Sequence, residues 1–171
     1  MANVFVTQHI GDGGIQKLRQ AGHAVTYRDE TEPMTPDELH TAVRSAEGLV
    51  CLLTDRVDTA VLDAAANLKM IANVAVGYDN IDLAAATERG ILVSNTPDVL
   101  TETTADHAFA LLLAVARRIP EADAFMRAGK YEKFEMVPPL LGLDVYGKTL
   151  GSWAGGELAR PLPDAAHWAL A

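Results

Sequence analysis

The strongest constraint on the fold is a regular alternation of short apolar segments with helical patterns over the first hundred residues. Five apolar segments are predicted strands: residues 3–8, 24–29, 48–53, 70–76 and 91–95. Helices are predicted between them, at residues 13–22, 35–45, 58–67 and 80–90. The clearest helix start is Thr35, which is followed by Pro36 and two acidic residues.

Apolar strands that are each followed by a helix indicate a parallel sheet covered on both faces. Because crossover connections between parallel strands are right-handed, few arrangements are possible. The simplest is an α/β fold with a doubly wound parallel sheet, a flavodoxin-like domain that closes near Asn95.

A second part of the chain begins with a strong helical pattern over residues 101–118, and a shorter helix is predicted at residues 121–128. Phe109, Leu112 and Leu113 are spaced for burial on one side of the longer helix. This helix is too apolar to stand alone, so we expect it to pack on another domain or another subunit. An uncovered face made of these three side chains would be an apolar patch of the kind that marks an interface.

The formal net charge of −9 argues against partners that are themselves anionic. An acidic surface repels phosphate backbones and anionic membranes, so neither nucleic acid nor a membrane is an expected partner. The longest apolar run, residues 108–116, is too short to span a bilayer, and the first ten residues lack the pattern of a signal peptide. The single cysteine, Cys51, excludes an internal disulfide and fits the cytoplasm, and its apolar surroundings predict a buried thiol rather than a reactive one.

Three motifs carry a resemblance to a known family: GYDNID at residues 77–82, NTPDVLTETTAD at residues 95–106 and DVYGKTLG at residues 144–151. In this order and spacing the chain resembles the D-isomer-specific 2-hydroxyacid dehydrogenases, most closely the glyoxylate and hydroxypyruvate reductases among them. The resemblance implies reduction of a small 2-oxo acid to a D-2-hydroxy acid with NAD or NADP as cofactor.

The resemblance also implies a domain organisation. Residues 1–97 are then a substrate domain, and residues 98–151 are the start of an NAD-binding, Rossmann-like domain that is incomplete here. The helix at residues 101–118 is expected to contribute to a homodimer.

Three site residues follow from the resemblance, and a further candidate follows from the predicted sheet. The backbone N–H groups of Val76 and Gly77 are expected to hold the substrate carboxylate, and Thr104 to lie near the nicotinamide. Leu53, with Thr54, ends the third predicted strand, at the edge where doubly wound sheets bind ligands. The simpler alternatives are a turn glycine, a helix-capping hydroxyl and ordinary strand-end residues.

The chain departs from the family pattern after Gly151. No G-x-G-x-x-G fingerprint follows, and Pro161 and Pro163 rule out the helix that it would open. The family's catalytic arginine, glutamate and histidine have no counterpart, so no catalytic residue is assigned, and no cluster has metal-ligand spacing. The sequence therefore predicts an inactive fragment that lacks the residues for NAD(P) binding and proton transfer.

A frameshift would explain the departure. In the alternative reading frame, the codons of Trp153–Ala154 and Trp168–Ala169 each spell a glycine, as the nucleotide fingerprint requires. Our hypothesis is that residues 152–171 are an aberrant, poorly ordered tail, which the encoding DNA would test. Two readings of function other than an enzyme stay open: a self-associating remnant of the substrate domain, or a module for another phosphate ligand, with Gly11, Gly13 and Gly14 after the first strand.

Overall fold

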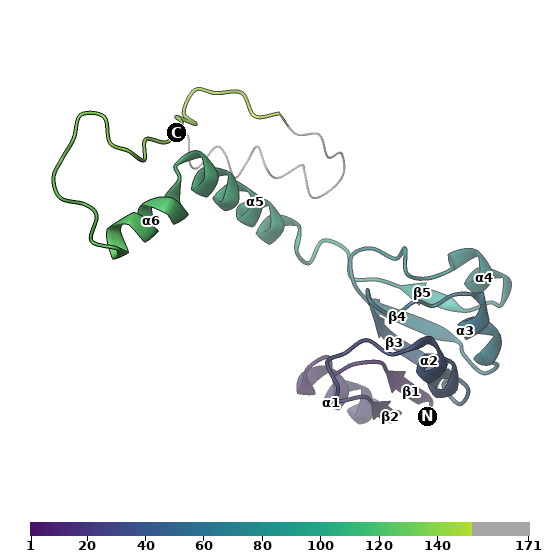
Figure 1. Cartoon of the computed structure of the whole chain (residues 1–171). Helices are drawn as coiled ribbons and strands as arrows, with labels where there is room; N and C mark the ends of the chain where they lie inside the picture. Colours follow the sequence, from purple (N-terminus) through teal and green to yellow (C-terminus); the bar gives the residue numbers. More distant parts are fainter. Residues whose placement is uncertain (152–171) are drawn as a thin grey trace. The chain divides into compact units, whose positions relative to one another are not determined.

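The computed structural model describes residues 1–151, which form two compact units. The first unit is Met1–Val99, and the second begins at Leu100 (Figure 1). The predicted aberrant tail, residues 152–171, lies outside the described residues.

The first unit is built on one parallel sheet. Its strands are β1 (Asn3–Val6), β2 (Ala24–Tyr27), β3 (Gly48–Leu52), β4 (Met70–Val74) and β5 (Leu92–Ser94). The order across the sheet is β2-β1-β3-β4-β5, and every neighbouring pair is parallel. This is the flavodoxin-like order, so the predicted fold class is confirmed. Each strand ends one or two residues before its predicted end, because the last residues of each apolar run turn into the loops at the carboxyl edge.

Four helices connect the strands: α1 (Asp12–Gln20), α2 (Pro36–Val43), α3 (Thr59–Ala64) and α4 (Leu83–Glu88). The predicted start of α2 is confirmed as a capping box, in which Thr35 and Glu38 each accept a hydrogen bond from the other's backbone N–H. The Thr35 N–H and the Thr35 hydroxyl both donate to the Glu38 carboxylate, which lowers the pKa of Glu38. Asp58 and Asp82 cap α3 and α4 by accepting hydrogen bonds from backbone N–H groups in the first turn, so polar side chains fix where α2, α3 and α4 begin.

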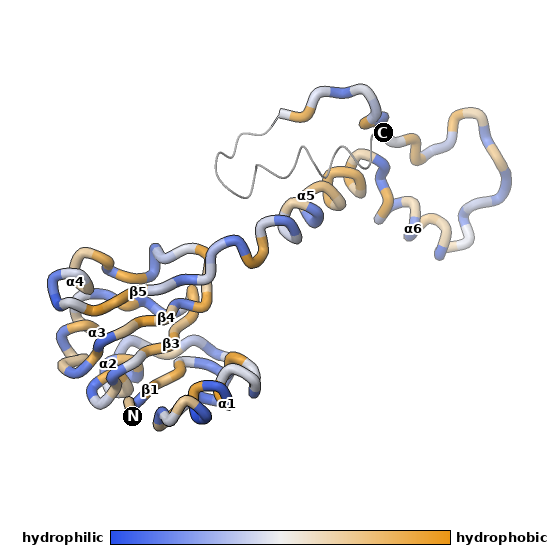
Figure 2. Tube along the Cα trace, turned by 180° about the vertical axis from the view of Figure 1, so that it is seen from behind, coloured by the Kyte–Doolittle hydropathy of each residue, from blue (hydrophilic) through white to orange (hydrophobic). Residues whose placement is uncertain are grey.

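The two faces of the sheet are covered by different helices (Figure 1). The right-handed crossovers place α1 on one face and α2, α3 and α4 on the other. The larger core lies under α2–α4, and the strands β3 and β4 that line it are mainly hydrophobic (Figure 2). Leu49 and Cys51 from β3 and Ile71 from β4 are almost fully buried there. One polar residue of β4, Asn73, is buried on the same face, with 2% of its surface exposed.

The second unit begins with α5 (Thr101–Ala116) and α6 (Ile119–Arg127). The long helix ends two residues before its predicted end, because Arg118 adopts a left-handed conformation with φ of 53°. Glu121 then pairs with the Arg118 guanidinium and fixes the start of α6. After α6 the chain returns to the end of α5, where the N–H of Leu143 donates to the carbonyl of Ala116 at 2.7 Å.

Burial along α5 corrects one expectation. Phe109 is buried, and Leu112 and Leu113 are half-buried, so these three residues do not form the exposed apolar face. The large exposed apolar side chains of the helix are instead Leu111, at 54%, and Val115, at 76%. The helical spacing identified the buried stripe, and the exposed pair lies beside it on the helix surface.

Candidate functional site

The candidate site lies at the carboxyl edge of the sheet, in the loops that follow β3 and β4. Leu52 is the register partner of Val74, so Leu53 and Ala75 leave the sheet on neighbouring strands. The two loops meet again at an isolated bridge between Val57 and Ile81. Ligands of doubly wound sheets bind at this edge, and the loops there are tied together at both ends.

Three successive peptide groups in the loop after β4 have their carbonyl oxygens occupied. The Ala75 carbonyl accepts from the Thr96 N–H at 2.9 Å. The Val76 carbonyl accepts from Asn95 Nδ2 at 2.8 Å. The Gly77 carbonyl accepts from Asn73 Nδ2 at 2.9 Å.

The N–H groups of the same three peptides belong to Val76, Gly77 and Tyr78. Residues 1–151 contain no cis peptide bond, and in a trans peptide the N–H points away from the carbonyl. Each N–H therefore points away from the group that holds its carbonyl. None of the three donates a hydrogen bond to another described residue. Successive free N–H groups of this kind can bind an anion.

Gly77 leaves open space at these peptide groups. It is exposed, its φ lies outside the left-handed region, and a Cβ built on it would have no described atom within 4 Å. The backbone conformation therefore does not demand a glycine, and neither does packing within the described residues. What the missing side chain provides is access to the free N–H groups.

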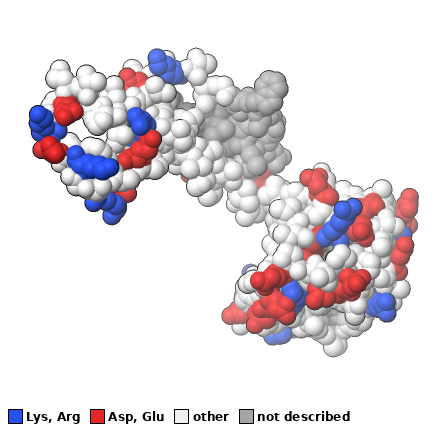
Figure 3. Space-filling view, viewed as in Figure 1, with Lys and Arg blue, Asp and Glu red and all other residues white. Residues whose placement is uncertain are grey.

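The electrostatics of the first unit make such donors necessary for an anionic ligand. Met1–Val99 contains fourteen Asp and Glu residues and only seven Lys and Arg residues. Acidic side chains are spread over the face of this unit seen in Figure 3. Their field opposes an anion, so attraction has to come from local positive dipoles. Backbone N–H groups supply these dipoles without a basic side chain.

Leu53 is 62% exposed and lines a hollow of about 500 Å³ beside the same loops. Thr54 lines the hollow as well. The charged residues that line the hollow are Arg56 and three carboxylates: Asp58, Asp79 and Asp82. Arg56 lies 3.8 Å from Asp58, so its charge is already opposed. The hollow offers an apolar contact through Leu53 but is too acidic to attract an anion.

The structure thus brings Leu53, Val76 and Gly77 together at one edge of the first unit. Thr104 belongs to the second unit, in the first turns of α5, where it is half-buried and its N–H donates to the Leu100 carbonyl at 2.9 Å.

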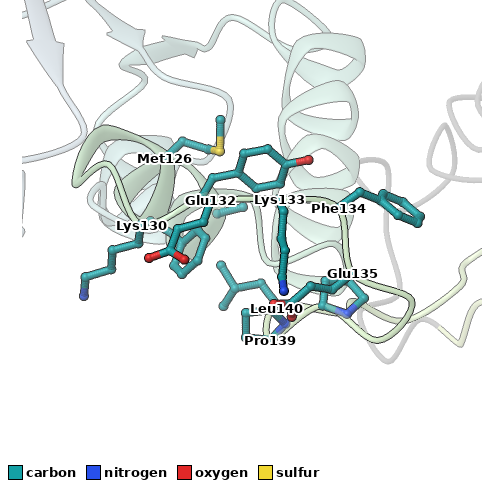
Figure 4. A pocket seen from close by; sticks show the side chains of 12 residues that line it. Met126, Lys130, Glu132, Lys133, Phe134, Glu135, Pro139 and Leu140 are labelled. Atoms are coloured by element: carbon teal, nitrogen blue, oxygen red, sulfur yellow. The ribbon is translucent and has the colours of Figure 1, made fainter.

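A second hollow, of about 370 Å³, lies between α6 and the chain that follows it (Figure 4). Apolar side chains dominate its lining, several of them aromatic or proline, and none of the predicted site residues lines it. Its two lysines, Lys130 and Lys133, are matched by Glu132 and Glu135. This balance gives the hollow no preference for an anion.

Sequence reasoning missed four polar residues whose side chains hydrogen-bond beneath the two loops of the site. They are Thr7, Asp55, Asn73 and Asn80, of which the first three are buried. The sequence feature that could have revealed this network is the asparagine inside the otherwise apolar β4. The neighbouring Cys51 is a buried free thiol, as predicted, and burial raises its pKa to about 12, with a further contribution from Asp55.

Other chemistry is not assembled within residues 1–151. The histidines of this part of the chain are scattered, and His9 simply contacts Asp12 at 3.0 Å. No three His, Cys, Asp or Glu side chains of the described residues are placed to hold a metal ion. None of the helices in that range has the length and apolar character needed to cross a bilayer.

Comparison with known proteins gives consistent matches. The family model described as "D-isomer specific 2-hydroxyacid dehydrogenase, catalytic domain" matches residues 4–157. A glyoxylate reductase of Korarchaeum cryptofilum is 49% identical over 155 residues, which is 91% of this chain and 46% of the relative. A solved protein from Thermus thermophilus is 41% identical with a TM-score of 0.86, covering 97% of this chain and 53% of that one.

A solved NADPH-dependent glyoxylate/hydroxypyruvate reductase from Sinorhizobium meliloti, in complex with NADP and malonate, is also similar. It is 29% identical with a TM-score of 0.73, and the match covers 98% of this chain and 50% of that one. The chain therefore spans about half the length of the relatives that it matches.

Proposed function

The chain belongs to the D-isomer specific 2-hydroxyacid dehydrogenase family, and on that premise we propose that its first unit is the substrate domain of a glyoxylate reductase-like enzyme. The reaction would reduce a 2-oxo acid such as glyoxylate to the D-2-hydroxy acid, with hydride from NADH or NADPH. In this proposal residues 1–97 bind the acid and residues 98–151 begin the nucleotide domain.

The observation that carries the proposal is the row of free N–H groups at Val76, Gly77 and Tyr78. Their carbonyls are held from behind, so the donors are oriented before a ligand arrives. A carboxylate matches this set because it is anionic and accepts several hydrogen bonds. Leu53 would contact the apolar side of the acid, and Thr104 would lie near the nicotinamide when the nucleotide domain is complete.

The division of labour in the proposed reaction follows from the residues present. The cofactor supplies the hydride, and the protein orients the acid and its proton donor. Residues 1–151 provide the carboxylate site, but the family's arginine, glutamate and histidine are not assigned to any of them. We therefore propose that this chain binds the acid without turning it over. A free, buried thiol fits a reducing compartment, and the cytoplasm is the location that we propose.

Oxalate, a carboxylate that cannot be hydride-reduced in this way, tests the proposed site. On titration into the ¹⁵N-labelled chain, shifts of amide resonances should centre on Val76 to Tyr78. Without an arginine partner, we expect millimolar affinity, about −4 kcal/mol. Sodium chloride at equal ionic strength is the control. Shifts that match the chloride control, with none centred on this loop, would contradict a carboxylate site.

A second role, self-association, is favoured by the exposed apolar side chains of α5. Leu111 and Val115 are one helical turn apart and lie on the same side of the helix. We propose that a second copy of this chain covers them, as in a homodimer formed through the helix at residues 101–118.

The substitution Val115→Asp is expected to weaken this dimer at least about tenfold, because a carboxylate would be buried at the interface. Ala110→Asp is the matched control, since Ala110 is exposed on another side of the same helix. Sedimentation velocity at micromolar concentration measures the effect. A parent chain that sediments as a monomer would reject the homodimer.

A further inference from the structure

Asn73 is a buried amide in the middle of an apolar strand. It lies on β4 between Ala72 and Val74, with 2% of its surface exposed, and shares the core face with Ile71. Burying a carboxamide is costly unless every hydrogen-bonding group of the amide finds a partner. An apolar residue would fill this position at a lower cost in desolvation, so the amide requires an explanation.

All the polar atoms of Asn73 are used. Its Nδ2 donates to the Gly77 carbonyl at 2.9 Å and to Asn80 Oδ1 at 3.0 Å. Its Oδ1 accepts from Cys51 Sγ at 3.4 Å and lies 3.3 Å from Asn80 Nδ2. Because the Gly77 carbonyl can only accept, the amide group that faces it must be the NH₂ group.

Asn80 extends the network to the other loop of the site. Its Nδ2 donates to the carbonyls of Leu52 and Asp55, at 3.1 Å and 3.0 Å. These two carbonyls flank Leu53, and the Asn80 carbonyl accepts from the Val57 N–H at 2.8 Å. One continuous chain of hydrogen bonds therefore runs from the peptide that carries the Tyr78 N–H to the Leu52–Leu53 peptide and to the Asp55–Arg56 peptide further along the same loop.

We infer that the Asn73–Asn80 carboxamide pair is the positioning device of the site, which fixes the free N–H groups of the Val76–Tyr78 loop relative to Leu53. The inference rests on the proposed carboxylate site and assigns the residues that set its geometry. Neither asparagine touches the acid. They act through the Gly77 carbonyl and through the Leu52 and Asp55 carbonyls.

The chemistry of the pair explains why a carboxamide stands at Asn73. Aspartate has the same shape but no N–H to hold the Gly77 carbonyl, and it would place a negative charge behind an anion site. Alanine would leave the Gly77 carbonyl and Asn80 Oδ1 without their donor. Either change frees the Gly77–Tyr78 peptide to rotate, which misdirects the Tyr78 N–H.

Oxalate titration of Asn73→Ala and Asn73→Asp tests the inference in the full chain. We expect the dissociation constant of oxalate to rise at least about tenfold in both variants. In both variants the Gly77 and Tyr78 amide resonances should shift even without oxalate, while the amides of β1 and β3 keep their hydrogen-exchange protection. Ile71→Val is the matched control, because it trims a buried side chain of the same strand face without touching the amides; oxalate binding should stay within about twofold of the parent.

The parent chain offers a test that needs no variant. The side-chain NH₂ resonances of Asn73 should shift in step with Gly77 as oxalate saturates the loop. If they do not move at saturation, or if a folded Asn73 variant binds oxalate as the parent does, the positioning role is rejected while the carboxylate site stands. If the parent itself shows no oxalate shifts at Val76–Tyr78, the proposed function fails first.

Discussion

Replacing Gly77 by valine is expected to abolish oxalate binding and leave the fold of the first unit intact. The position tolerates a side chain, because φ is outside the left-handed region and no described atom lies within 4 Å of a built Cβ. The branched side chain would occupy the open space beside the Val76, Gly77 and Tyr78 N–H groups. In the parent, tens of millimolar oxalate is roughly tenfold above the expected millimolar dissociation constant, so the loop should be saturated. At the same concentration, Gly77→Val should show no saturable shifts.

Gly13→Val is the matched control for this substitution. Gly13 lies in α1, has no positive φ and also has no described atom near a built Cβ, but it is not in the candidate site. This variant should bind oxalate as the parent does. Undiminished oxalate binding by Gly77→Val would show that the carboxylate does not approach this peptide, and the proposed site would have to be abandoned.

The fold was predictable because its determinants are local. The apolar strands, the Thr35–Pro36 helix start and the right-handed crossover rule together leave one simple strand order, and the structure has it. Strand ends were less predictable. Residues such as Leu53 and Val76 continue an apolar run in the sequence, but hydrogen bonds to distant loops turn the chain before them.

The candidate site was predictable only in part. Val76 and Gly77 were identified through the family motif, since a glycine after a strand also suits an ordinary turn. The network behind them is non-local. Asn73 meets Asn80 seven residues later, and Asn80 reaches back 28 residues to Leu52. No periodicity in the sequence encodes such contacts, because they depend on which loops the sheet order brings together.

Asp55 shows the same dependence on tertiary structure, and its removal is expected to destabilise the first unit by about 3 kcal/mol. Its carboxylate is 4% exposed and accepts hydrogen bonds from the Thr7 hydroxyl and, at 2.8 Å, from the Leu52 N–H. Asp55→Ala would leave both donors unpaired, and Thr7 is 2% exposed. Native-state hydrogen exchange of the β1 and β3 amides measures this loss within the first unit alone.

Two further variants separate the buried hydrogen bonds from the loss of a charge. Asp63→Ala removes an exposed carboxylate that pairs with Arg89 on the surface, and it should cost under about 1 kcal/mol. Adding Thr7→Val to Asp55→Ala removes one orphaned hydroxyl, so about 1 kcal/mol of the stability should return. If Asp55→Ala costs no more than Asp63→Ala, the carboxylate does not hold the end of β1 to the loop after β3. The loop that carries Leu53 would then be attached to the sheet edge through Asn80 and the Val57–Ile81 bridge.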